Sequence, residues 1–153
     1  MSANLDLVRS IFAAWERGDF HSTEWAHPNI EFVRPDGPEP GTWIGIPEMS
    51  QTTRDILTAW DDLRQVPDEL QEVDAERVLV LFRATGRGKM SGVDLQSKWA
   101  NVFHLRDGKV TRILLYSDRD RALADLGLAS EGDAVDRRDR EFGFSAVSVE
   151  PEN

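Results

Sequence analysis

Arg34 and Asp36 lie two positions apart in the segment FVRPDG, which follows a short run with the alternation of a β-strand. A guanidinium can bind an anionic oxygen, and a carboxylate can accept a proton. A strand end that opens into a loop is a frequent position for such residues. The pair is therefore a candidate for chemistry, and the same residues also suit an ordinary turn.

Asn101 is a second candidate because it interrupts an apolar pattern. Alternation along residues 96–106 places it on the same strand face as Trp99 and Phe103. A buried amide needs hydrogen-bond partners. Backbone or water could supply them, or the carbonyl of a ligand in a mostly apolar pocket could do so. The sequence leaves both interpretations open.

The three histidines do not form a metal-binding pattern. His21 and His27 have no further ligand at a standard spacing, and His104 falls on the opposite strand face from Asn101. Zinc sites need three or four converging ligands. The segment GRGKMSG lies between two expected strands and suits a hairpin connection better than a phosphate loop. We therefore expect neither a metal nor an organic cofactor.

The sequence predicts helices near its N-terminus among the elements that position these side chains. Helical spacing of apolar residues predicts a first helix over 4–17, capped by Asn4 and ended by Gly18. The pattern further predicts a short helix over 20–26, a strand over 29–34, a loop over 35–45, a helix from Pro47 to about residue 61, and a last helix over 119–128.

Strands are expected over 63–73, 77–87, 96–106 and 110–116. Asp107-Gly108 between the last two predicts a type I′ hairpin. Helices followed by consecutive strands indicate an α+β domain in which a curved antiparallel sheet is closed by the N-terminal helices. We assign residues 1–129 to this cone-shaped domain, and 130–153 to a charged tail that is mobile or contacts an edge or partner.

The two faces of this sheet differ in character. One face is apolar and should meet the helices. The other carries polar and basic residues and is either solvated or a contact between two copies. The residues assigned to this second face are Arg83, Thr85, Arg87, Lys98, His104, Arg106, Arg112 and Tyr116.

Composition narrows the class of protein. The 153 residues are 40% hydrophobic, which suits one globular domain, and the net charge of −10 disfavours nucleic acid and anionic membranes as partners. The chain has no Cys, which removes thiolate catalysis. The N-terminal segment carries Asp6 and Arg9 within its apolar pattern, unlike a signal peptide or a membrane span. A cytoplasmic protein is the expectation.

The order of elements and several local segments resemble the SnoaL-like branch of the nuclear transport factor 2-like superfamily, whose relatives include ketosteroid isomerases, polyketide cyclases and limonene epoxide hydrolases. The similar segments cover about residues 4–128 and are IFAAWERGDF, HPNIEFVRP, GTWIG, ILTAWDDL and VFHLRDGKVTRILLYSDRDRALADLGL. The resemblance implies a cone with an internal apolar pocket and a homodimer formed through the outer sheet face.

Catalytic relatives place a carboxylate base at the end of the first strand, a donor on the first helix, and an acid or donor on a later strand. On this chain these positions correspond to Arg34, Ile11 and Asn101. Arginine stays protonated and cannot act as the base. The resemblance thus leaves Asp36, just beyond the strand, as the candidate proton acceptor.

Two hypotheses follow. The first is a cofactor-independent isomerase, cyclase or hydrolase for an apolar, carbonyl-bearing or cyclic compound, in which Asn101 orients the substrate, Arg34 binds an anionic oxygen and Asp36 accepts a proton. The second is a non-catalytic ligand-binding or dimeric scaffold domain. In both, the residues expected to line the pocket are Ile11, Trp15, Phe32, Phe82, Ala84, Trp99, Phe103, Ile113, Leu115 and Ser117.

Overall fold

The computed structural model describes residues 2–128. The chain divides into two units, Met1–Asp118 and Arg119–Asn153. The first unit contains the sheet and two helices, and every feature of the candidate site lies within it. The expectations for residues 130–153 fall outside the described residues.

Six strands of the described chain form one mixed, open sheet in the order β2-β1-β6-β5-β4-β3. Their bounds are β1 Ala26–Arg34, β2 Gly41–Ile44, β3 Trp60–Asp74, β4 Arg77–Gly88, β5 Asp94–Arg106 and β6 Lys109–Tyr116. Strands β3 to β6 form the expected meander. The α+β class with a curved sheet is confirmed. The described strand pairs are antiparallel as expected except for one, because β1 pairs with β6 in parallel across a long connection.

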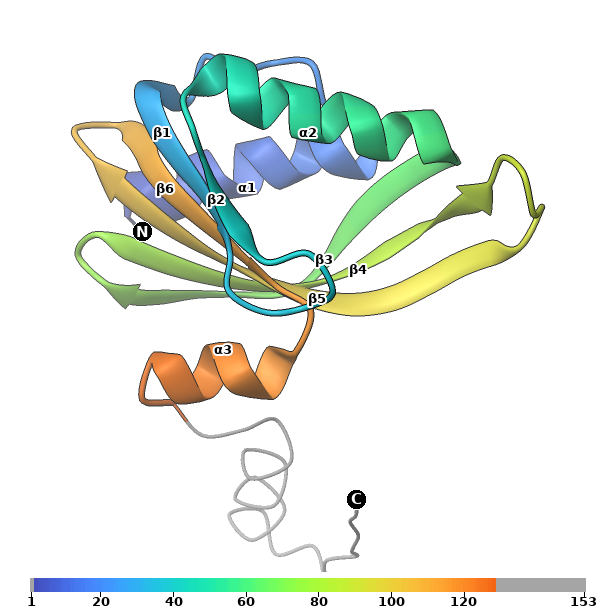
Figure 1. Cartoon of the computed structure of the whole chain (residues 1–153). Helices are drawn as coiled ribbons and strands as arrows, with labels where there is room; N and C mark the ends of the chain where they lie inside the picture. The colour runs from blue at the N-terminus through green and yellow to red at the C-terminus, as the bar shows by residue number, and fades with distance from the viewer. Residues whose placement is uncertain (1, 129–153) are drawn as a thin grey trace, which may run out of the picture. The chain divides into compact units, whose positions relative to one another are not determined.

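Two amphipathic helices, α1 (Ala3–Glu16) and α2 (Ile46–Ala59), lie on the same side of this sheet (Figure 1). Ser2, rather than the expected Asn4, caps α1 by accepting the Leu5 N–H at 2.9 Å. Gly18 follows the helix with φ +84°, as expected. The last helix, α3 (Arg119–Asp125), belongs to the second unit. No helix among residues 2–128 is long and apolar enough to cross a membrane.

Two local predictions are wrong. Residues 20–26 do not form a helix: the Trp25 carbonyl accepts the Val110 N–H at 2.8 Å, and β1 begins at Ala26. Strand pairing with β6 therefore overrides the local helical pattern. The stretch Gly41–Ile44, expected within a loop, is strand β2 and pairs antiparallel with β1.

The hairpin prediction is confirmed, since Asp107 and Gly108 have φ values of +52° and +76°. This tight turn joins β5 to β6 with Phe103 opposite Ile113 and Asn101 opposite Leu115. The register puts these four side chains on the concave face, beneath the helices. The register of this hairpin therefore determines which side chains of β5 and β6 face the helices.

The concave face holds the core. Phe12 of α1 is buried, and its ring centroid lies 5.4 Å from that of Phe82 and 6.0 Å from that of Phe103. The opposite face is less polar than expected: its basic residues flank a centre of buried side chains, namely Leu79, Leu81, Ala100, Val102 and Tyr116. The expectation of a polar and basic second face therefore holds only in part, because charged side chains share this face with a buried apolar centre.

Candidate ligand-binding site

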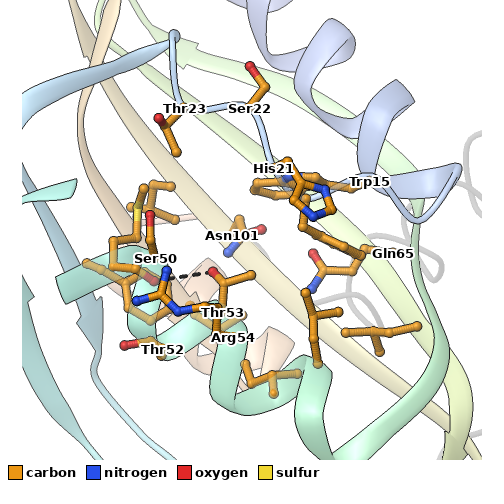
Figure 2. Close-up of a pocket in the computed structure, with 18 of the residues that line it drawn as sticks. Trp15, His21, Ser22, Thr23, Ser50, Thr52, Thr53, Arg54, Gln65 and Asn101 are labelled. Atoms are coloured by element: carbon orange, nitrogen blue, oxygen red, sulfur yellow. Dashed lines mark hydrogen bonds between the residues drawn. The ribbon is translucent and has the colours of Figure 1, made fainter. Parts of the chain in front are cut away.

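A cavity of about 270 Å³ lies between the concave sheet face, helix α2 and the loop that joins α1 to β1. Figure 2 shows its lining side chains arranged around Asn101. The lining residues are Trp15, Phe20, His21, Ser22, Thr23, Trp25, Phe32, Met49, Ser50, Thr52, Thr53, Arg54, Ile56, Leu57, Leu63, Gln65, Asn101, Ile113 and Leu115. Ten of these nineteen residues are apolar and nine are polar or charged, so the lining can both bury apolar surface and orient a small molecule.

Aromatic side chains from α1 and the following loop form one wall. The Trp15 ring centroid lies 6.0 Å from that of Trp25 in an edge-to-face arrangement and 6.1 Å from that of Phe20 in a stacked one. These contacts hold the rings in place, because aromatic pairs favour such offset geometries. Phe32 and Ile113, on neighbouring strands, add flat apolar surface to the floor.

Asn101 is the polar centre of this floor. The residue is 3% exposed, and its Nδ2 donates to the Leu114 carbonyl at 3.3 Å. Within residues 2–128, no hydrogen bond is made by its Oδ1 or by its second amide N–H. A buried amide normally uses these groups, and an unused one costs free energy. Asn101 therefore offers one acceptor and one donor to a molecule in the cavity.

Helix α2 and strand β3 supply further polar groups. The Thr53 hydroxyl donates to the Met49 carbonyl at 3.2 Å and so is engaged by its own helix. The side chains of Ser50 and Gln65 make no hydrogen bond to any other described residue. The cavity thus has adaptable polar groups on two of its sides, with Asn101 between them (Figure 2).

Two lining residues can carry charge. The Arg54 guanidinium donates from Nη2 to Gln51 Oε1 at 2.7 Å and has no carboxylate partner in the described part of the chain. His21 lies at the rim with a 90% exposed side chain, and its Nδ1 is 3.4 Å from Asp19 Oδ1. Sequence reasoning did not assign His21 to the site, because the expected helix over 20–26 hid the loop that brings it there.

The expected lining residues fall into two groups. Trp15, Phe32, Asn101, Ile113 and Leu115 line the cavity. The remainder lie outside it: Ile11, Phe82, Ala84 and Phe103 are buried side chains, Trp99 donates from Nε1 to Ser97 Oγ at 2.7 Å, and Ser117 contacts Asp36. The cavity therefore occupies only part of the concave face.

Arg34 and Asp36 do not line the cavity. Asp36 accepts hydrogen bonds from the Ser117 N–H at 2.8 Å, the Ser117 hydroxyl at 3.0 Å and the Asp118 N–H at 3.1 Å. These bonds tie the loop after β1 to the end of β6. The structure records no ion pair between Arg34 and Asp36, and the Arg34 guanidinium has no hydrogen-bond partner among residues 2–128. Here the carboxylate acts as an anchor for the loop.

The opposite sheet face carries a charged row at equivalent positions of five strands. His104 of β5 lies opposite Arg77 and Arg112, which bind Asp74 and Glu31 respectively with N–O distances of 2.8 Å. Burial, and then the two guanidinium groups, lower the pKa of His104 below its ordinary value. No group of three or more metal-ligating side chains occurs in the part of the chain that the structure describes.

Comparison with known proteins places this geometry in context. A family model described as a SnoaL-like domain matches residues 8–113. A similar solved structure is an NTF2-like protein of unknown function from Burkholderia pseudomallei, which is 25% identical with a TM-score of 0.68 over 81% of this chain and 97% of that one. No functionally curated protein matches the sequence.

Two further structures share the fold. TerC, co-crystallised with polyporic acid, is 24% identical with a TM-score of 0.66 over 82% of this chain and 98% of that one. A proposed SnoaL-like polyketide cyclase from Jannaschia sp. CCS1 is 18% identical with a TM-score of 0.66 over 84% and 92% of the two chains. Because the family model spans most of the sheet and both helices that enclose the cavity, the chain belongs to the SnoaL-like domain family.

Proposed function

We propose that the cavity binds a small, cyclic, largely apolar molecule through one polar group that hydrogen-bonds to Asn101. The observation that carries this proposal is the buried Asn101 amide, whose Oδ1 has no partner among residues 2–128 while aromatic and aliphatic walls surround it. A ligand hydroxyl or carbonyl would satisfy that amide without water.

The chemistry of the walls indicates the class of ligand. No carboxylate lines the cavity in the described structure, so a cationic group would find no counter-charge there. The flat surfaces of Trp15, Trp25 and Phe32 suit a planar ring system. The presence of polyporic acid in the TerC crystal supports an aromatic or quinone-like ligand for a domain of this fold.

Two roles remain for such a site. Binding without catalysis is favoured by the position of Asp36, the expected proton acceptor, whose two oxygens are engaged by the end of β6. An isomerase, cyclase or hydrolase is the second candidate, and the observation that favours it is a histidine at the cavity rim. A homodimer through the outer sheet face remains a prediction of the family resemblance, which sedimentation velocity tests.

Two matched aromatic compounds test the binding proposal. 2-Naphthol can donate a hydrogen bond to Asn101 Oδ1, whereas 2-methoxynaphthalene cannot. We expect the protein to prefer 2-naphthol by about tenfold, which corresponds to about 1.4 kcal/mol. Fluorescence titration of each compound measures the two dissociation constants.

The Asn101→Leu variant should lose this preference while still binding 2-methoxynaphthalene. Asn29→Leu, an exposed position that does not line the cavity, is the matched control and should behave as the unmodified protein. Equal affinity for the two compounds, or an unchanged preference in Asn101→Leu, would contradict the proposed role of Asn101.

A further inference from the structure

The rim of the cavity carries an Asp19–His21 pair that its backbone holds in place. Gly18, with φ +84°, ends α1, and the Asp19 N–H then donates to the Ala14 carbonyl at 2.9 Å. Asp19 Oδ1 accepts the His21 backbone N–H at 3.1 Å, which closes a short Asx turn. The turn fixes the direction in which the chain presents His21 at the cavity.

The same carboxylate also faces the imidazole. Asp19 Oδ1 lies 3.4 Å from His21 Nδ1, a long contact of the kind that tightens when a substrate binds. The backbone and side-chain hydrogen bonds of His21 lower the pKa of Asp19, so this carboxylate is ionised at neutral pH. A proton on Nδ1 that points to a carboxylate leaves Nε2 with its lone pair. Nε2 is then the nitrogen that can accept a proton.

The composition of the cavity leaves few other groups for proton transfer. Among the described lining residues, only His21 and Arg54 have a side chain with a basic nitrogen. Arginine remains protonated in proteins, whereas the ordinary pKa of histidine lies near neutrality. Of the charged groups around the cavity, Asp19 lies beside the imidazole, Arg17 interacts with Asp19, and Arg54 of α2 belongs to the same lining. A bound molecule can therefore exchange a proton at His21.

We propose that His21 Nε2 is the proton acceptor for a carbonyl compound bound in the cavity, with Asp19 as the residue that positions the imidazole. The proposal rests on the proposed binding function. Nε2 takes a proton from the carbon beside the carbonyl, and the C–H electron pair forms the enolate double bond. The second N–H of Asn101 donates to the enolate oxygen. The exposed imidazolium exchanges this proton with solvent and then protonates the carbon, which restores the carbonyl and completes the exchange.

The probe that tests this step is 2-tetralone, a bicyclic ketone with an acidic CH2 group between its ring and its carbonyl. In D2O, proton NMR follows the replacement of these hydrogens by deuterium. We expect the protein to accelerate the exchange at least tenfold over the same concentration of free imidazole, within the usual range for general-base catalysis. Binding of 2-tetralone is measured separately by saturation-transfer NMR.

Three variants identify the acceptor. His21→Gln should lower the exchange rate at least tenfold while the dissociation constant changes less than twofold. His27→Gln, an exposed histidine that does not line the cavity, should leave both unchanged. Asp19→Asn keeps an oxygen for the backbone turn but lacks the negative charge. It should lower the exchange rate and reduce the fraction of Nδ1-protonated tautomer seen in 15N spectra.

The outcomes separate the two proposals. Bound 2-tetralone that exchanges no faster than with imidazole, or equally fast in His21→Gln, overturns the role of His21 and leaves the binding function standing. Failure of 2-tetralone to bind overturns the role of His21, and failure of both 2-tetralone and 2-naphthol to bind overturns both proposals. An Asp19→Asn variant with unchanged exchange rate and tautomer would reduce Asp19 to a structural turn residue and overturn its positioning role.

Discussion

Helices α1 and α2 cover the same sheet face, yet the half beneath α1 is filled and the half beneath α2 is hollow. Both helices have 14 residues and an apolar stripe. Helix α1 buries Val8, Ile11 and Phe12, whereas α2 buries only Met49. Facing the hollow, α2 presents short polar side chains such as Ser50 and Thr53. Apolar spacing thus places a helix on a sheet, and the size and polarity of its inward side chains decide whether a cavity remains.

Phe12→Ala should have the largest effect on this contrast, because it removes the ring that contacts both Phe82 and Phe103. We expect a loss of about 3–5 kcal/mol in the free energy of unfolding, the usual cost of truncating a buried aromatic side chain. Leu57→Ala, beside the cavity, should cost less than about 1.5 kcal/mol. Urea denaturation measures both. Equal costs would mean that the two halves are packed alike.

Asp36→Ala tests whether the loop after β1 contributes to ligand binding in the hollow half or only to the stability of the fold. It removes three hydrogen bonds to Ser117 and Asp118, and we expect a loss of about 1–2 kcal/mol in the free energy of unfolding. The affinity for 2-naphthol should stay unchanged, because Asp36 does not line the cavity. A weakened affinity in a folded variant would place this carboxylate in the site after all.

Asn101→Leu should stabilise the protein by about 1 kcal/mol, the opposite sign from a core truncation. The variant removes a buried amide that is incompletely hydrogen-bonded and replaces it with an apolar group of similar size. Thermal unfolding compares it with Val102→Ala, a buried truncation on the same strand that should destabilise. A destabilised Asn101→Leu would show that this amide is part of the scaffold.

The smallest expected effect is a pH dependence of stability that comes from His104 on the opposite sheet face. Because the pKa of His104 is lower in the folded chain, the unfolded chain binds a proton first as the pH falls below about 6.5. The free energy of unfolding should therefore decrease modestly between pH 7 and pH 5. Urea midpoints at both pH values measure this slope. His104→Gln should flatten it and His27→Gln should not, whereas an equal slope in all three would exclude His104 as the cause.

The sequence predicted the fold well where local and long-range signals agree. The apolar stripe of α1, the positive φ of Gly18 and the Asp107-Gly108 turn follow from side-chain spacing and backbone sterics alone. It predicted the wrong structure for residues 20–26 and 41–44. The backbone of Trp25 bonds to β6, and residues 41–44 pair with β1. Neither partner can be recognised from the local sequence. Tertiary pairing overrode local propensity in each case.

The site was predicted in part. Strand alternation brought Asn101 onto the concave face beside Ile113 and Leu115, because register follows from the period of two. The same alternation could not separate lining residues from filled core, since Phe82 and Phe103 share that face. The sequence could not place His21 at the cavity, because its position depends on the path of a loop. Arg34 and Asp36 were assigned to the site from their place at a strand end, but they do not line the cavity.

The parallel pairing of β1 with β6 also sets the order in which the molecule can assemble. Phe32 pairs with Ile113, so the first strand has no neighbour on that side until nearly the whole first unit exists. The meander from β3 to β6 closes through short connections, and contacts of this kind form early. We expect β1 to dock last, so that on the ribosome the floor of the cavity is completed only after Tyr116 has emerged.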